Sequence, residues 1–265
     1  MATTQGYAPV NGLRMYYEIR GKGKPLILLH GGAGATEMFA PIYGALSEKR
    51  QVIAVDLQAH GRTADIDRPL RYELMAEDIA ALIKHLRLEK ADLMGYSLGG
   101  GVALRTVIQH PELVRKAVLV SATCKRNGWY PEVLAGMAQG GESAEAMKQT
   151  PMYQLYSKVA PRLEDWPVLM TKTSEMLKRD YDWSEEVAKI RIPVMLIVGD
   201  ADSVRTAHAV DFFELLGGGK RDAGWDGSGM SNARLAILPG TTHFTIFSSP
   251  AMVSAAVAFL DEPAR

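Results

Sequence analysis

The sequence predicts an α/β fold, with a mostly parallel, doubly wound sheet of about eight strands and an inserted helical cap. Two observations carry this prediction. Short, nearly uninterrupted runs rich in valine, isoleucine and leucine alternate along the 265 residues with segments of helical periodicity. One long segment between two of these runs contains no convincing strand. The alternation is typical of strands that helices cover on both faces, and the long segment indicates an insertion.

Six apolar runs are expected to form buried strands, and five segments between them to form helices. The strands are expected at 25–30, 51–56, 91–96, 116–121, 193–199 and 234–239. The helices are expected at 39–49, 71–88, 98–110, 204–216 and 252–261. Residues 13–19 alternate more weakly and are interpreted as part of an antiparallel hairpin at the sheet edge. The glycine-rich stretch 217–229 is expected to be an exposed loop without recognisable chemistry.

The segment without strands covers residues 123–190 and is rich in methionine and aromatic side chains. We expect it to form a helical cap, inserted into an α/β core made of residues 1–122 and 191–265. Methionine and aromatic residues are typical of an adaptable apolar pocket, although each of them also fits a purely structural role in the core. The candidates for the substrate pocket are Trp129, Met152 and Tyr153.

Composition and charge narrow the class of partner. Lys and Arg total 30 and Asp and Glu total 30, so no net field favours a nucleic acid or an anionic membrane. The single cysteine, Cys124, cannot form an internal disulfide, which is typical of a reducing compartment. Residues 1–10 lack the features of a signal peptide, and no apolar run approaches the roughly 20 residues that cross a bilayer. We therefore expect a soluble cytoplasmic protein, monomeric or homodimeric, that binds a small-molecule substrate.

The strongest chemical signal is Gly95-Tyr96-Ser97-Leu98-Gly99, which lies where a predicted strand ends and a predicted helix begins. A serine in such a tight turn presents its hydroxyl at the carboxyl edge of the sheet. Small residues are needed on both sides because the turn brings the strand and helix backbones close together. The helix N-terminus also favours negative charge that develops nearby. We predict that Ser97 is a nucleophile.

A serine nucleophile needs a base, and six histidines compete for that role. Five of them have adequate structural accounts in loops or helices: His30, His60, His85, His110 and His208. His243 differs because it follows the last predicted strand and so lies at the same sheet edge as Ser97. We predict that His243 is the general base.

The base needs a carboxylate that fixes its tautomer and stabilises the imidazolium. Strand 193–199 is followed by Asp200 and Asp202, and both lie at the edge that carries Ser97. The two residues after strand 116–121, Ala122 and Thr123, offer no competing carboxylate. The residues by themselves leave Asp200 and Asp202 open, and either gives the chain order serine, acid, histidine.

These motifs resemble those of the α/β-hydrolase superfamily, in its serine-nucleophile, esterase-like branch, over about residues 13–260. The matching pieces are His30-Gly31-Gly32-Ala33-Gly34, Asp56-x-x-x-His60-Gly61-Arg62-Thr63, Gly95-x-Ser97-x-Gly99, Gly199-x-x-Asp202 and Gly240-x-x-His243. Ala59 and Thr63 depart from the glycine and serine that many relatives have.

The resemblance implies roles for particular residues. It implies a triad of Ser97, Asp202 and His243, because the acid of the family usually lies three residues past this glycine. It also implies an oxyanion hole made by the backbone N–H groups of Gly32 and Leu98, which are fixed donors for charge that develops in the transition state. No metal and no cofactor are expected.

The expected function is that of a carboxylesterase, which cleaves small, fairly apolar esters through an acyl-enzyme on Ser97. Lactone hydrolysis and carbon–carbon bond hydrolysis stay open as alternatives, because the same three residues serve all of these reactions. A non-catalytic receptor that retains the triad is a further alternative. Turnover of a chromogenic short-chain ester would separate it from an enzyme.

Overall fold

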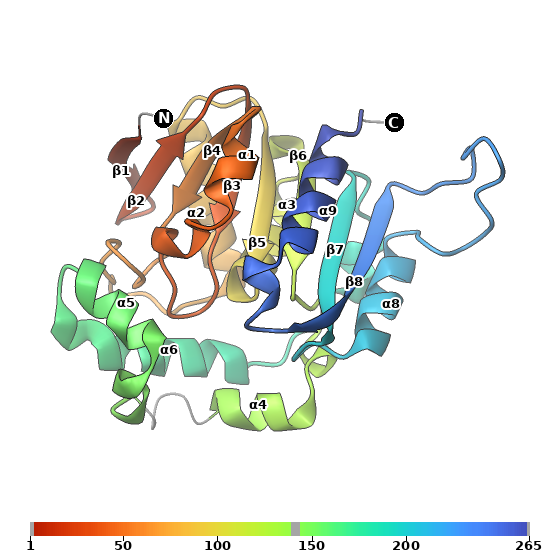
Figure 1. Cartoon of the computed structure of the whole chain (residues 1–265). Helices are drawn as coiled ribbons and strands as arrows, with labels where there is room; N and C mark the ends of the chain where they lie inside the picture. The colour runs from red at the N-terminus through yellow and green to blue at the C-terminus, as the bar shows by residue number, and fades with distance from the viewer. Residues whose placement is uncertain (1–2, 139–143, 264–265) are drawn as a thin grey trace.

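Eight strands form one sheet in the computed structural model, which describes residues 3–138 and 144–263 (Figure 1). The order across the sheet is β1-β2-β4-β3-β5-β6-β7-β8. The six strands from β3 to β8 run parallel, while β2 is antiparallel to both β1 and β4. The strands are β1 (Thr4–Val10), β2 (Leu13–Arg20), β3 (Lys24–Leu29), β4 (Arg50–Val55), β5 (Ala91–Tyr96), β6 (Val114–Val120), β7 (Val194–Ala201) and β8 (Ala233–Thr242).

Helices cover both faces of this sheet (Figure 1). One face packs against α2 (Tyr72–His85), α3 (Leu98–Gln109) and α8 (Thr206–Leu215), and the other against α1 (Tyr43–Ser47) and α9 (Pro250–Asp261). Alternate residues of β3 enter the two cores: Ile27 and Leu29 face one, and Leu26 and Leu28 face the other. The short 3-10 helices are η1 (Thr36–Phe39), η2 (Pro111–Leu113), η3 (Arg126–Gly128), η4 (Ala146–Gln149), η5 (Leu163–Asp165) and η6 (Ile246–Ser248). The predicted doubly wound α/β fold is confirmed.

Two elements differ from the sequence-based expectation. The partner of the 13–19 strand is a strand that was not expected, β1, and Asn11 and Gly12 connect the two with positive φ angles of 47° and 86°. The helix expected over 39–49 is longer than the helix in the structure, which is α1. Pro41 lacks an N–H group and separates α1 from the preceding 3-10 turn.

Between β6 and β7, the described residues form four α-helices, besides η3, η4 and η5, and no strand of the sheet. The α-helices are α4 (Pro131–Ala138), α5 (Pro151–Val159), α6 (Trp166–Lys178) and α7 (Ser184–Val187). Figure 1 shows α4, α5 and α6 beyond the carboxyl ends of the parallel strands. Lys172 ties α6 to the chain after β4, since its ammonium group donates to Asp65 and to the carbonyl oxygens of Ile66 and Arg68. No described helix is long and apolar enough to cross a membrane.

Candidate active site

Ser97 lies in the turn that joins β5 to α3, with φ 53° and ψ −118°. A residue with a side chain rarely adopts this conformation, and such strain is typical of functional sites. The turn is possible because the residues two positions before and two positions after Ser97 are glycine. A Cβ at Gly95 would overlap the carbonyl oxygen of Gly99, and a Cβ at Gly99 would overlap the carbonyl oxygen of Leu29. The glycine spacing therefore follows from backbone contact, and it leaves the hydroxyl of Ser97 at the carboxyl edge of the sheet.

His243 follows β8 directly, and its side chain contacts Ser97 at the same edge of the sheet. Its Nε2 lies 3.0 Å from Ser97 Oγ, and its Nδ1 lies 2.9 Å from Asp202 Oδ1. A carboxylate can only accept a hydrogen bond, so Nδ1 carries the proton and Nε2 is free to accept one from the serine. The Tyr96 hydroxyl donates to the His243 carbonyl oxygen at 2.6 Å, and the Trp129 ring packs edge-on at 5.5 Å. These contacts hold the imidazole in one orientation.

Asp202 lies in the turn after β7, and its carboxylate is buried. It accepts hydrogen bonds from His243, from the backbone N–H groups of Gly199 at 3.1 Å and Val204 at 3.2 Å, and from Ser121 Oγ. Burial alone would raise the pKa of this carboxyl. The hydrogen bond and charge of His243, together with the donors Ser121 and Gly199, outweigh burial and hold the pKa below its usual value. Asp200, in contrast, lies within β7 and is exposed, so the structure brings only Asp202 to His243.

The two backbone groups proposed for oxyanion binding come from different segments of the chain. Leu98 follows Ser97 as the first residue of α3, and Gly32 lines the same cavity as Ser97. Buried side chains hold the loop that contains Gly32 at both ends. His30 Nε2 accepts from the Leu57 N–H at 3.1 Å, and Asp56 accepts from the Thr36 N–H at 2.7 Å. Burial raises the pKa of Asp56 to about 6.

A cavity of about 360 Å³ opens over Ser97 and His243. Its walls come from the loop after β3, from α5 and from the segment after β8. Among the described residues, no charged side chain lines it. The lining residues are Gly31, Gly32, Ala33, Gly34, Met38, Pro41, Tyr96, Ser97, Pro151, Met152, Leu155, His243, Phe244, Phe247 and Ser248.

A family model described as the alpha/beta hydrolase fold matches residues 24–256 of this chain. The chain belongs to the α/β hydrolase family.

Individual relatives agree with this assignment. Over 213 residues the chain is 30% identical to AB hydrolase superfamily protein YisY of Bacillus subtilis (strain 168). The match covers 72% of this chain and 78% of YisY. The enol-lactonase of Burkholderia xenovorans LB400 superposes with a TM-score of 0.75 at 20% identity, covering 97% of this chain and 100% of that one. Carboxylesterase CesB of Bacillus subtilis superposes with a TM-score of 0.73 at 22% identity, covering 98% of this chain and 92% of that one. At these identities the two structures share the fold of this α/β hydrolase.

The structure places the three pocket candidates of this hydrolase differently. Met152, on α5, lines the cavity. Tyr153, the next residue, packs edge-on against Trp166 at 5.2 Å and does not line it. Trp129 is buried, its ring packs against the His243 ring, and it is not among the residues that line the cavity. Adjacent residues of a helix point in different directions, so composition alone cannot distinguish such positions.

Sequence reasoning missed several residues of this site. Met38, Phe244 and Phe247 line the cavity but lie outside residues 123–190. They were missed because pocket residues were predicted only within that segment. Ser121 was missed because the search at the end of that strand considered only carboxylates. Its position as the last residue of the predicted 116–121 strand, at the edge that carries Ser97, was the available signal.

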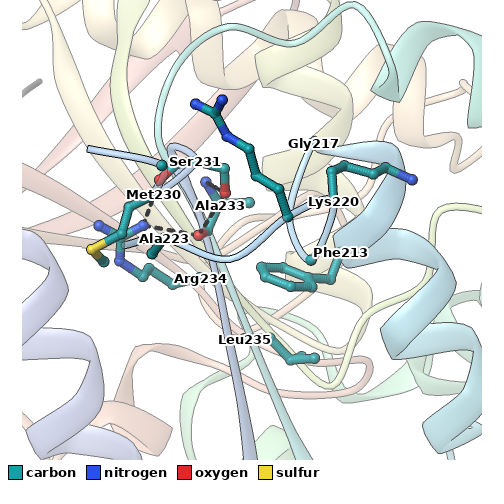
Figure 2. A pocket seen from close by; sticks show the side chains of 12 residues that line it. Phe213, Gly217, Lys220, Ala223, Met230, Ser231, Ala233, Arg234 and Leu235 are labelled. Atoms are coloured by element: carbon teal, nitrogen blue, oxygen red, sulfur yellow. Dashed lines mark hydrogen bonds between the residues drawn. The ribbon is translucent and has the colours of Figure 1, made fainter. Parts of the chain in front are cut away.

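A separate cavity of about 500 Å³ lies under the glycine-rich loop, at the other end of β8 (Figure 2). Figure 2 shows Phe213 and Leu235 on one side of it and Arg234 on another. None of the triad residues lines this cavity. Trp225, within the same loop, is fully exposed.

Proposed function

We propose that this α/β hydrolase cleaves carboxylic esters of small, uncharged, apolar substrates through an acyl-enzyme on Ser97. The observation that carries the proposal is the chain of hydrogen bonds from Asp202 through His243 to Ser97, next to a cavity that no charged side chain lines among the described residues. A serine, a base within hydrogen-bond reach and a third group that orients the base are the parts required for nucleophilic catalysis.

The geometry suits a two-step acyl transfer. As Ser97 Oγ attacks the ester carbonyl carbon, His243 Nε2 takes the hydroxyl proton. The N–H groups of Gly32 and Leu98 stabilise the oxyanion, and the imidazolium then returns the proton to the departing alcohol. A water molecule attacks the acyl-enzyme with His243 again as base, and the carboxylic acid leaves. Asp202 remains ionised throughout and holds the proton on Nδ1.

The cavity supports an uncharged substrate. A carboxylate or ammonium group that entered it would lose its hydration and find no opposite charge among the described lining residues, which is costly. The volume of about 360 Å³ lies near the lower end of the roughly 300–1,000 Å³ of ligand pockets, which favours small molecules. The methionine and phenylalanine side chains supply apolar contact.

Matched esters test this proposal. We expect p-nitrophenyl butyrate to be hydrolysed with a kcat/KM at least about 100-fold above that of mono-p-nitrophenyl succinate, because the succinate carboxylate would be desolvated without a partner. Neutral lactones and diketones are assayed in parallel. Faster turnover of either class, or a preference for the charged ester, would replace the ester proposal, and stoichiometric release would indicate a receptor.

Met152→Ala is expected to change the preference for acyl length, with its neighbour Tyr153→Ala as the matched control. Removing the Met152 side chain enlarges the cavity, so the ratio of kcat/KM for p-nitrophenyl octanoate to that for the acetate should rise about 3- to 10-fold. Tyr153→Ala should lower thermal stability, because its ring packs on Trp166, without changing this ratio. Equal changes in the ratio for both variants would contradict the role of Met152 in the pocket.

A further inference from the structure

Ser121 is a fully buried residue at the end of β6, and its backbone is strained. Its φ angle is 51°, in the left-handed region that residues other than glycine rarely adopt. The conformation is held by the sheet, because the Ser121 N–H donates to the carbonyl oxygen of Ile197 in β7 at 2.8 Å. Strain that the surrounding structure maintains is common at functional sites.

In this conformation the Ser121 hydroxyl donates to Asp202 Oδ2. The same oxygen accepts from the Gly199 N–H, and Oδ1 accepts from His243 and from the Val204 N–H. Each carboxylate oxygen therefore accepts two hydrogen bonds, and these four bonds hold the carboxylate in one orientation. In the described part of the chain, Ser121 and His243 supply the side-chain donors, and the other donors belong to the backbone.

We propose that Ser121 is a positioning residue for hydrolysis, whose hydroxyl holds the Asp202 carboxylate in the orientation that aligns His243 with Ser97. This inference rests on the proposed function of the triad. Without the hydroxyl, Oδ2 keeps a single donor, so the carboxylate gains rotational freedom and His243 is aligned less well. Ser121 has no contact with the substrate in this role.

Two substitutions separate the hydroxyl from the backbone strain. Ser121→Ala removes the donor and keeps the Cβ, whereas Ser121→Gly removes the donor and relieves the left-handed strain. In both variants we expect kcat for p-nitrophenyl butyrate to fall about tenfold, since hydrogen bonds to charged groups are the stronger ones. KM should stay within about twofold, because the hydroxyl does not touch the substrate and only the alignment of the base is lost.

Ser203→Ala serves as the control, because Ser203 is next to Asp202 in sequence and its hydroxyl has no role in this proposal. It should retain the kcat of the wild-type protein. Melting temperatures are measured for all variants, and Ser121→Gly should be no less stable than Ser121→Ala.

Three results would overturn the inference. Wild-type kcat in both Ser121 variants would show that the hydroxyl has no such role. Recovery of activity in Ser121→Gly alone would show that the backbone conformation matters and the donor does not. In both cases the same assay on Ser97→Ala would still show loss of activity, so the proposed function would stand. If Ser97→Ala kept its activity, both would fall.

Discussion

Ser97→Ala is expected to lower kcat for an ester substrate by about four to six orders of magnitude, because it removes the nucleophile and leaves His243 with no proton to accept. The fold should remain, since the hydrogen bond from the backbone N–H of residue 97 to the Val120 carbonyl oxygen does not involve the side chain. Initial rates with p-nitrophenyl butyrate and a melting curve measure the two effects.

A phosphonate ester that reacts with activated serines provides an independent control for this variant. It should label the wild-type protein with a stoichiometry of one and leave Ser97→Ala unlabelled. A variant that keeps more than about a tenth of the wild-type rate, or that is still labelled, would show that another group is the nucleophile.

Asp202→Asn is expected to lower kcat by about 10⁴, whereas Asp200→Asn should change it by less than about threefold. All four groups that bond to the Asp202 carboxylate are hydrogen-bond donors. The amide N–H₂ group of an asparagine at this position must therefore face a donor, with which it cannot form a hydrogen bond. Facing His243, it would favour the tautomer with the proton on Nε2, which cannot accept the proton of Ser97. The Asp200 side chain is exposed and contributes only a screened charge.

The two variants are compared by steady-state kinetics on one ester across the pH range in which the wild-type protein is stable. A loss at Asp200→Asn equal to or greater than the loss at Asp202→Asn would reverse the assignment of the acid. Melting temperatures distinguish a lost hydrogen-bond network from a lost fold.

Much of the fold could be predicted because its signals are local. The apolar run of β3 is uninterrupted since both of its faces are buried, and each of the six predicted strands forms part of the sheet. The signals failed where a neighbour in space supplied the missing information. β1 was not predicted and is a strand because it pairs with β2, and the helix expected over 39–49 was broken by a proline whose effect on periodicity is small.

The sequence by itself determined where the turn that carries Ser97 lies. Gly95 is required because its backbone closely approaches Gly99 within the same short segment, so the glycine spacing predicts the turn. The reason for Gly99, its close approach to Leu29 of β3, appears only in the tertiary structure. The sequence also predicted that Ser97 and His243 lie at the same edge of the sheet, because each follows the carboxyl end of a parallel strand.

Only the tertiary structure decided between Asp200 and Asp202, between Met152 and Tyr153, and whether Ser121 reaches the acid. Met152 and Tyr153 are adjacent on one helix and point in different directions, whereas Asp200 lies within β7 and Asp202 follows its end, so the two carboxylates have different surroundings. The partners of these residues come from elements far along the chain. Ser121 and Asp202 are 81 residues apart, and Ser97 and His243 are 146 apart. Contacts of this kind depend on the packing of whole elements, which no local pattern encodes.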